Sequence, residues 1–289
     1  LIVTGGHGTG KTTILRGILD LFSRMELRAL LAAPTGRAAK RLQEVTGQEA
    51  STIHRLLESQ LDPATGQLIF TRDEDNPLKA HAVIVDETSM VDLPLLASLL
   101  RALPTGCRLI LVGDPDQLPP VGPGCPLSDI LRSGVVPAVR LTEIFRQAQE
   151  SLIVMNAHRV NSGVMPDLKT VTSDFFFLRR RTEEAVASTI GDLCRTRLPD
   201  RMGIPPEEIQ VLSPTRKGPT GTASLNLLLQ AQLNPPAPDK KEKKWGDFSF
   251  REGDRVMQIR NNYDILWKKT DGTQVGTGIF NGDIGVITE

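Results

Sequence analysis

The chain alternates between short apolar runs and longer stretches in which apolar residues recur every three or four positions. The apolar runs have the length of buried strands and lie at Leu1–Thr4, Leu27–Ala33, Ala82–Asp86 and Arg108–Val112. The stretches between them predict helices at Lys11–Met25, Gly36–Val45 and Leu93–Ala102. Strands that alternate with helices predict an α/β fold, in which helices cover both faces of a parallel sheet.

Turn residues interrupt this alternation between the second helix and the third strand. Ser51 is predicted to cap a short third helix. The Asp-Pro-Ala-Thr-Gly turn that follows Leu61 then predicts a β-hairpin, which we expect as an insertion at about 61–79.

A second set of elements begins at about Gln149, so we expect a first lobe at 1–148 and a second lobe at 149–289. The second lobe is predicted to contain helices at 153–160, 183–195 and 223–232 and strands at 175–178 and 209–213. A Pro- and Lys-rich spacer at about 234–246 is expected to be mobile, and its lysines are interpreted as a solvated loop in preference to a nucleic-acid contact. Short strands are predicted after it, at 254–260, 275–280 and 283–288.

The composition is that of an ordinary globular protein, with 39% hydrophobic and 24% charged residues. No apolar run has the length of a membrane span, and no signal peptide is recognisable. The cysteines lack metal or disulfide spacing, so we expect a cytoplasmic protein. The zero net charge argues mildly against a protein that holds nucleic acid by charge alone. Leu1 and Glu289 both lie in predicted strands, which suggests a part of a longer chain.

The segment GGHGTGKT at residues 5–12 has the spacing of a phosphate-binding loop between a strand and a helix. Gly8 and Gly10 would let the backbone N–H groups approach phosphate oxygens. Lys11 is expected to reach the terminal phosphates, and Thr12 to offer its hydroxyl to Mg²⁺. The sequence therefore predicts binding of a nucleoside triphosphate.

Two adjacent carboxylates follow the third predicted strand, at the sheet edge where ligands of open α/β folds bind. Asp86 would hold Mg²⁺ through water, and Glu87 would deprotonate the attacking water. After the fourth strand, Gln117 is placed to sense the γ-phosphate. Arg146 is either a surface residue or an arginine finger that stabilises the transferring phosphoryl group.

Several further segments accompany these groups in a fixed order. They are APTGRAAKRL (33–42), STIHRLL (51–57), VIVDETSMVD (83–92), LVGDPDQLPPVGPG (111–124), LTEIFRQ (141–147) and VLSPTRKGPTGTASLN (211–226). With the phosphate-binding loop, this set resembles the RecD-like superfamily-one DNA helicases, and the free-standing form more than the subunit of the RecBCD exonuclease. The likeness covers nearly the whole chain.

The resemblance implies two RecA-like lobes that use ATP and Mg²⁺ in the cleft between them and move 5′ to 3′ on single-stranded DNA. It implies that the hairpin is a pin that splits duplexes, and that a small β-barrel insertion begins after Arg260. Thr35, Thr52, His54 and Lys217 would contact DNA without sequence preference, although His54 could instead pack locally, and Lys217 could instead contact ATP. The expected state is a monomer, with duplex junctions and other repair proteins as partners.

The chain departs from the family pattern at several points. The last two motifs, one of which carries a second arginine finger, are absent, as is the upstream glutamine that contacts adenine. His7 occupies a position where proline is common.

Three alternatives remain at this stage: a helicase subunit of a RecBCD-type nuclease, an ATP-gated DNA-binding module that does not unwind, and a P-loop GTPase. The GTPase would need an Asn-Lys-x-Asp element, which the sequence lacks.

Overall fold

The computed structural model describes residues 1–289 except 7, 62–67, 144–149, 171–173, 247, 261, 269–271, 273–274, 280 and 289. The chain divides into two compact units. The first comprises Leu1–Phe176 and Asn261–Asn281, and the second Phe177–Arg260 and Gly282–Glu289. The lobe boundary at residue 149 stays a prediction, because a compact unit need not coincide with a functional lobe.

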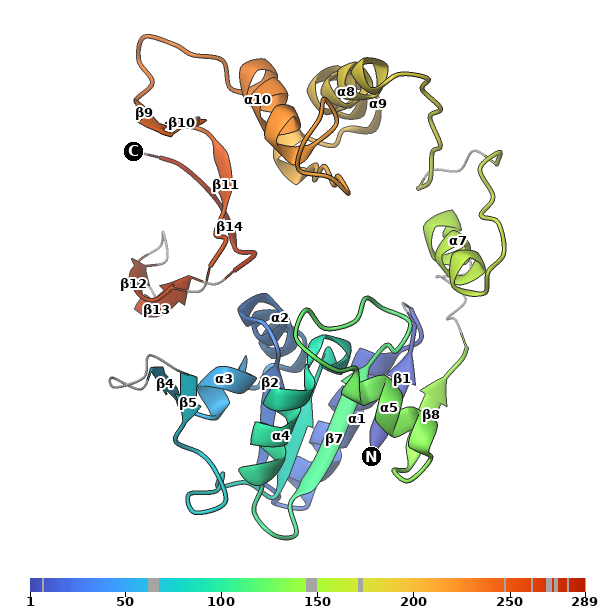
Figure 1. Ribbon diagram of the computed structural model, residues 1–289, viewed down its shortest axis with the longest axis vertical. Helices are drawn as coiled ribbons and strands as arrows, with labels where there is room; N and C mark the ends of the chain where they lie inside the picture. The colour runs from blue at the N-terminus through green and yellow to red at the C-terminus, as the bar shows by residue number, and fades with distance from the viewer. Residues whose placement is uncertain are drawn as a thin grey trace. The chain divides into compact units, whose positions relative to one another are not determined.

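The first unit is built on a six-stranded sheet in which neighbouring strands are parallel (Figure 1). Its order is β3-β2-β6-β7-β1-β8. The strands are β1 (Ile2–Gly5), β2 (Ala29–Ala33), β3 (Ala50–Thr52), β6 (Ala82–Val85), β7 (Arg108–Gly113) and β8 (Ala138–Leu141). The predicted α/β class with a parallel sheet is confirmed. Because the strands are parallel, their carboxyl ends meet at one edge of the sheet.

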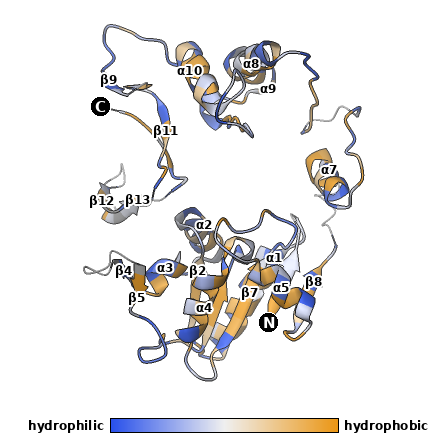
Figure 2. Cartoon of the chain, in the orientation of Figure 1, coloured by the Kyte–Doolittle hydropathy of each residue, from blue (hydrophilic) through white to orange (hydrophobic). Residues whose placement is uncertain are grey.

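Helices cover both faces of this sheet. The helices are α1 (Lys11–Arg24), α2 (Gly36–Thr46), α4 (Leu93–Arg101) and α5 (Pro126–Ser133), with a 3₁₀ turn η1 (Thr88–Met90). Helix α7 (Leu152–Asn161) follows later in the chain. Leu15 of α1 and Leu42 of α2 share a core with Ile84, whereas Leu99 of α4 shares the other core with Val83 and Val85. Alternate residues of β6 thus face opposite helical layers, which explains why the central strands are continuously apolar (Figure 2).

The expected hairpin is present, as β4 (Ser59–Leu61) pairs antiparallel with β5 (Leu68–Phe70). The predicted cap at Ser51 is wrong. Ser51 belongs to β3, which pairs with β2 at the sheet edge, so the following helix α3 (Ile53–Leu56) starts later. Thr52 caps α3, because its hydroxyl oxygen accepts a hydrogen bond from the N–H of Arg55 at 3.1 Å.

The second unit begins with helices. They are α8 (Glu183–Asp192), the π-helical turn η2 (Leu193–Arg197), α9 (Leu198–Met202), the 3₁₀ turn η3 (Pro206–Glu208) and α10 (Thr222–Leu233). The strands predicted at 175–178 and 209–213 do not form, because neither segment pairs with a neighbouring strand among the described residues. An apolar run becomes a strand only when a partner satisfies its backbone.

Six short strands follow α10, paired two by two. They are β9 (Glu242–Trp245) with β10 (Phe248–Arg251), β11 (Arg255–Met257) with β14 (Ile284–Val286), and β12 (Asn262–Lys268) with β13 (Val275–Ile279). The mobility expected for the spacer at about 234–246 stays a prediction. The structure shows that Asn234, at its start, is buried and donates from its amide to Asp254 at 2.7 Å, and that its last part forms β9.

A membrane-crossing helix would need a long apolar stretch, and none of the helices in the described part of the chain has one.

Candidate nucleotide-binding site

The loop between β1 and α1 wraps tightly at the carboxyl edge of the sheet. Gly8 and Gly10 have φ angles of 77° and 88°, a backbone conformation that residues other than glycine rarely adopt. A Cβ atom at Gly5 would lie 2.4 Å from the hydroxyl oxygen of Thr9, so this position has no room for a side chain. No described side chain caps α1 at Gly10, which leaves its first N–H groups available to an anion.

Lys11 lies across this loop. Its ammonium group donates hydrogen bonds to the carbonyl oxygens of Gly5 at 2.6 Å and Gly6 at 3.0 Å. Thr12, the next residue, is exposed at the first turn of α1. The loop therefore presents a cation, a hydroxyl and uncapped N–H groups at one place, which suits a phosphate chain with its metal ion.

Two carboxylates follow β6 at the same edge. The backbone N–H of Glu87 donates to the Asp86 carboxylate at 2.9 Å, and Glu87 has a φ of 50°, in the left-handed region. Burial raises the pKa of both carboxyl groups, and the charge of Asp86 raises the pKa of Glu87 further. Lys11 opposes both shifts electrostatically, which ties the loop and the carboxylates into one site.

Arg41 was missed in the sequence. It lies on α2 and, like Lys11, lowers the pKa of Asp86 and Glu87 through its positive charge. Its position in the segment APTGRAAKRL could have suggested a place near the site, but the helical pattern alone reads it as an exposed charge.

Thr88 is a second residue that the sequence did not single out. It is fully buried, and its hydroxyl lies 3.0 Å from the carbonyl oxygens of both Val85 and Val112. Thr88 thus joins the ends of β6 and β7, the strands that carry the carboxylates and the Gln117 loop.

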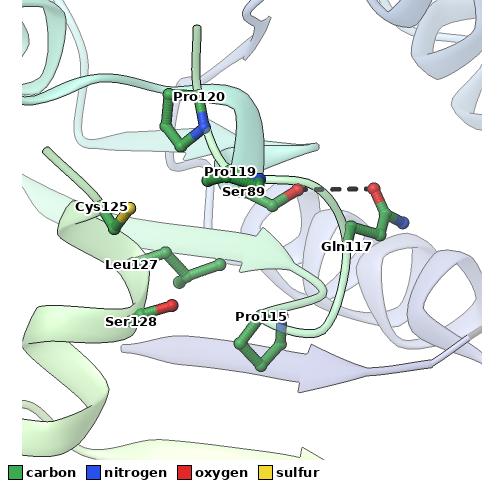
Figure 3. A pocket seen from close by; sticks show the side chains of 8 residues that line it. All are labelled: Ser89, Pro115, Gln117, Pro119, Pro120, Cys125, Leu127 and Ser128. Atoms are coloured by element: carbon green, nitrogen blue, oxygen red, sulfur yellow. Dashed lines mark hydrogen bonds between the residues drawn. The ribbon is translucent and has the colours of Figure 1, made fainter. Parts of the chain in front are cut away.

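Gln117 lies in the loop after β7, and its amide oxygen accepts a hydrogen bond from the Ser89 hydroxyl at 3.5 Å (Figure 3). The two residues line a cavity of about 160 Å³ with Pro115, Pro119, Pro120, Cys125, Leu127 and Ser128. The cavity is too small for a nucleotide. We interpret it as a gap in the packing between the Gln117 loop and the start of α5. Gln117 itself is exposed.

Thr35 and Thr52 have structural roles besides the predicted DNA contact. Thr35 caps α2, accepting from the N–H of Ala38 at 3.2 Å, and is half-buried. Thr52 caps α3 and is only 4% exposed, which leaves little surface for a ligand. His54 lies against Phe70 of the hairpin, with ring centroids 5.9 Å apart, so local packing accounts for part of its environment.

For two further predicted residues, membership of this site stays a prediction. Arg146 and its neighbours fall outside the described residues. Lys217 is exposed in the second unit, in a loop whose carbonyl groups at Thr215 and Arg216 accept from the first N–H groups of α10.

Among the residues that the structure describes, no cluster of three or more His, Cys, Asp or Glu could hold a metal ion. Magnesium at nucleotide sites is commonly held by one or two protein groups together with phosphates and water. Thr12 and Asp86 remain the predicted pair.

Two family models match the chain. One, described as an AAA domain, matches residues 1–123, and the other, an ATP-dependent RecD-like DNA helicase SH3 domain, matches residues 225–289. The chain is 37% identical over 287 residues to the ATP-dependent RecD2 DNA helicase of Deinococcus radiodurans. It is 31% identical over 330 residues to the RecBCD enzyme subunit RecD of Mycolicibacterium smegmatis.

Both alignments cover 99% of this chain but only 36% and 54% of the two proteins, so the chain spans about a third to a half of these relatives. A structure of Pif1 helicases that unwind forked double-stranded DNA matches with a TM-score of 0.50 and 20% identity. That match covers 100% of this chain and 67% of the other. At this identity it supports the α/β fold alone.

Proposed function

The chain belongs to the RecD-like DNA helicase family, and from this premise we propose that it is the ATP-hydrolysing core of a DNA helicase. The observation that carries the proposal is the carboxyl edge of the sheet. There the glycine loop with Lys11 lies near two half-buried carboxylates. The N-terminus of α2, where the family motif places a DNA contact, begins at the same edge.

Each group has a role that its surroundings support. The N–H groups of the loop and Lys11 would bind the phosphate chain. Thr12 and Asp86 would hold Mg²⁺, which would neutralise charge on the β- and γ-phosphates. Glu87, whose pKa is raised by burial, would accept a proton from the attacking water. Gln117 would sense the γ-phosphate, and Arg146 would stabilise the charge that develops on it.

The finer assignments follow the family. We propose that the protein moves 5′ to 3′ on single-stranded DNA as a monomer in the cytoplasm, in repair or recombination, with the β4–β5 hairpin as the pin. DNA contacts from Thr35, Thr52, His54 and Lys217 would be to phosphate, sugar and base stacks, hence without sequence preference. The higher identity to RecD2 than to RecD supports a free-standing enzyme.

A Lys11→Ala variant of the full-length protein tests the site. DNA-stimulated ATP hydrolysis should be lost, because the variant lacks the lysine that would bind the terminal phosphates. The matched control is Lys169→Ala, which removes an exposed lysine and should leave hydrolysis unchanged. Hydrolysis by Lys11→Ala at the wild-type rate would show that the site is wrongly assigned.

Unwinding of forked substrates with only a 5′ or only a 3′ single-stranded tail tests the motor and its direction. We expect unwinding of the 5′-tailed fork, abolished in Lys11→Ala. Unwinding confined to the 3′-tailed fork would refute the direction. Hydrolysis with no unwinding of either substrate would favour an ATP-gated DNA-binding module.

A further inference from the structure

The β9–β10 hairpin has one aromatic face and one polar face. Phe248 lies opposite Trp245, and Phe250 lies opposite Lys243. Side chains of directly opposed residues in an antiparallel pair share a face, so these four side chains form one surface, which we call the aromatic face. Glu242, Lys244, Ser249 and Arg251 occupy the other face.

The polar face is turned inward at the end that carries Arg251. Arg251 is 8% exposed, and its guanidinium donates to the Glu242 carboxylate and to the carbonyl oxygen of Asn234. The backbone N–H of Arg251 donates to Asp254 at 2.8 Å. These bonds attach the hairpin to the end of α10 and fix which of its faces meets solvent.

The aromatic face is therefore exposed. Trp245 is 69% exposed, Phe250 44% and Phe248 41%. Three adjacent aromatic side chains in water forgo a large gain from burial, since aromatic rings contribute heavily where they are covered. An exposed patch of this kind usually marks a binding surface.

The charges around the face indicate what binds there. Lys241, Lys243 and Lys244 are exposed on or beside the hairpin, whereas Glu242, the one acidic residue of β9, is paired with Arg251. A surface that combines flat aromatic rings with free positive charge complements a ligand with flat rings and negative charge. Single-stranded nucleic acid has both, because its bases stack on aromatic side chains and its phosphates attract lysine. If a purely apolar protein segment bound to the aromatic face, the lysines beside it would contact no opposite charge.

We propose that the aromatic face of the β9–β10 hairpin is a stacking platform for single-stranded DNA, with Trp245 as its principal contact and Lys243 beside it on a phosphate. The platform rests on the proposed function in that single-stranded DNA is the substrate. Its residues differ from the predicted contacts at Thr35, Thr52, His54 and Lys217.

The test is binding of fluorescently labelled oligo-dT to the full-length protein, followed by anisotropy at several salt concentrations. Trp245→Ala should weaken binding roughly 5- to 100-fold, as expected for the loss of one base–aromatic stack. Trp245→Phe should recover most of the affinity. Phe177→Ala, which removes an aromatic residue that is 53% exposed elsewhere, should bind like the wild type.

Salt dependence separates stacking from charge. Lys243→Gln should lower the slope of log affinity against log salt by about 0.7, the value for one phosphate contact on a single strand. Trp245→Ala should leave that slope unchanged. Wild-type affinity in Trp245→Ala would overturn the proposal, and so would strong shielding of Trp245 from iodide quenching in the free protein, because a protein segment would then cover the face.

The two proposals fail in different ways. If the wild-type protein does not bind oligo-dT, the proposed function is wrong. If the wild type binds and both Trp245→Ala and Lys243→Gln bind equally well, only the platform is wrong. Because Trp245 is exposed, its replacement should leave the thermal unfolding midpoint unchanged, and this measurement excludes misfolding as the cause of a loss.

Discussion

Glu87 combines a buried carboxyl group with a strained backbone. Its φ of 50° is unusual for a residue with a side chain, and such strain is found most often at functional sites. The strained backbone and the partial burial both restrict the orientation and the solvation of the Glu87 carboxylate. They fit a base that must point at one water molecule.

Glu87→Gln should separate binding from chemistry. Nucleotide affinity should persist, because the glycine loop and Lys11 are intact, while the single-turnover rate of hydrolysis should fall by about 10²–10⁴, the usual contribution of a positioned base. A fluorescent ATP analogue would measure affinity, and quenched flow the rate. Near-normal hydrolysis in Glu87→Gln would assign the base elsewhere.

His54 predicts a pH dependence of stability. Burial lowers the pKa of its imidazole, and the charge of Asp92 offsets this only in part. The unfolded chain therefore binds a proton at higher pH than the folded chain. The contribution of neutral His54 to stability is complete above the unfolded pKa of about 6.5, and it is lost as the pH falls toward the lowered folded pKa.

Thermal unfolding between pH 7.5 and 5 would reveal this effect (the pH range follows from the histidine pKa). The unfolding midpoint of the wild type should fall more steeply across this window than that of His54→Gln, which carries no titrating ring. Equal slopes in the two proteins would mean that His54 is protonated as readily in the folded state as in the unfolded one.

At the scale of elements, variants at the N-terminus of α2 can distinguish an effect on stability from an effect on DNA binding. Thr35 caps this helix and is also a predicted DNA contact. Thr35→Ala should cost about 0.5–2 kcal/mol of stability through the lost cap. Thr35→Asp retains an acceptor and should preserve stability, while its negative charge should weaken binding to phosphate.

Denaturant unfolding and oligo-dT anisotropy on the same two variants would make the comparison. DNA affinity of Thr35→Asp at the wild-type level, with stability also intact, would restrict Thr35 to its capping role.

The elements themselves were predictable where local pattern and tertiary environment agree. The four central strands and helices α1, α2 and α4 lie within one to two residues of their predicted ends, because buried strands and amphipathic helices carry strong periodic signals. The loop at residues 5–12 and the carboxylates at 86–87 were predictable for a related reason. Their chemistry requires fixed residue types at fixed spacing.

Other features depend on partners that local sequence does not reveal. Ser51 pairs in β3 because β2 lies beside it, although its own sequence suits a helix cap. Strand β9 is rich in lysine, yet it forms because β10 pairs with it and the Arg251 network fixes it. The segments at 175–178 and 209–213 carry strand-like sequence but are not strands in the described part of the chain. Thr88 and Arg41 were not predicted for the same reason, because their roles depend on neighbours that are distant in sequence.

At the scale of the whole molecule, the two units should respond separately to mutation. Arg251→Met removes the hydrogen bond that joins the β9–β10 hairpin to Asn234 at the end of α10, and also the bond to Glu242 within the hairpin. We expect a loss of about 1–3 kcal/mol, because polar groups of low exposure are left without partners. Hydrogen exchange should quicken for amides near β10 and α10 and remain unchanged in the six-stranded sheet. Uniform acceleration throughout the chain would indicate one cooperative unit.

The position of β1 in its sheet has a consequence for how the protein is made. Both neighbours of β1 lie about a hundred residues or more further along the chain, because Ile2 pairs with Leu111 and with Ala138. At ribosomal speeds of about 5–20 residues per second, an apolar strand waits roughly 5–20 seconds for its first partner, about a hundred residues downstream. Strands β2 and β3 can pair much sooner, since Leu31 meets Ala50. The strand that leads into the phosphate loop thus leaves the ribosome well before the two strands that cover it, which makes it a natural target for chaperones that bind nascent apolar segments.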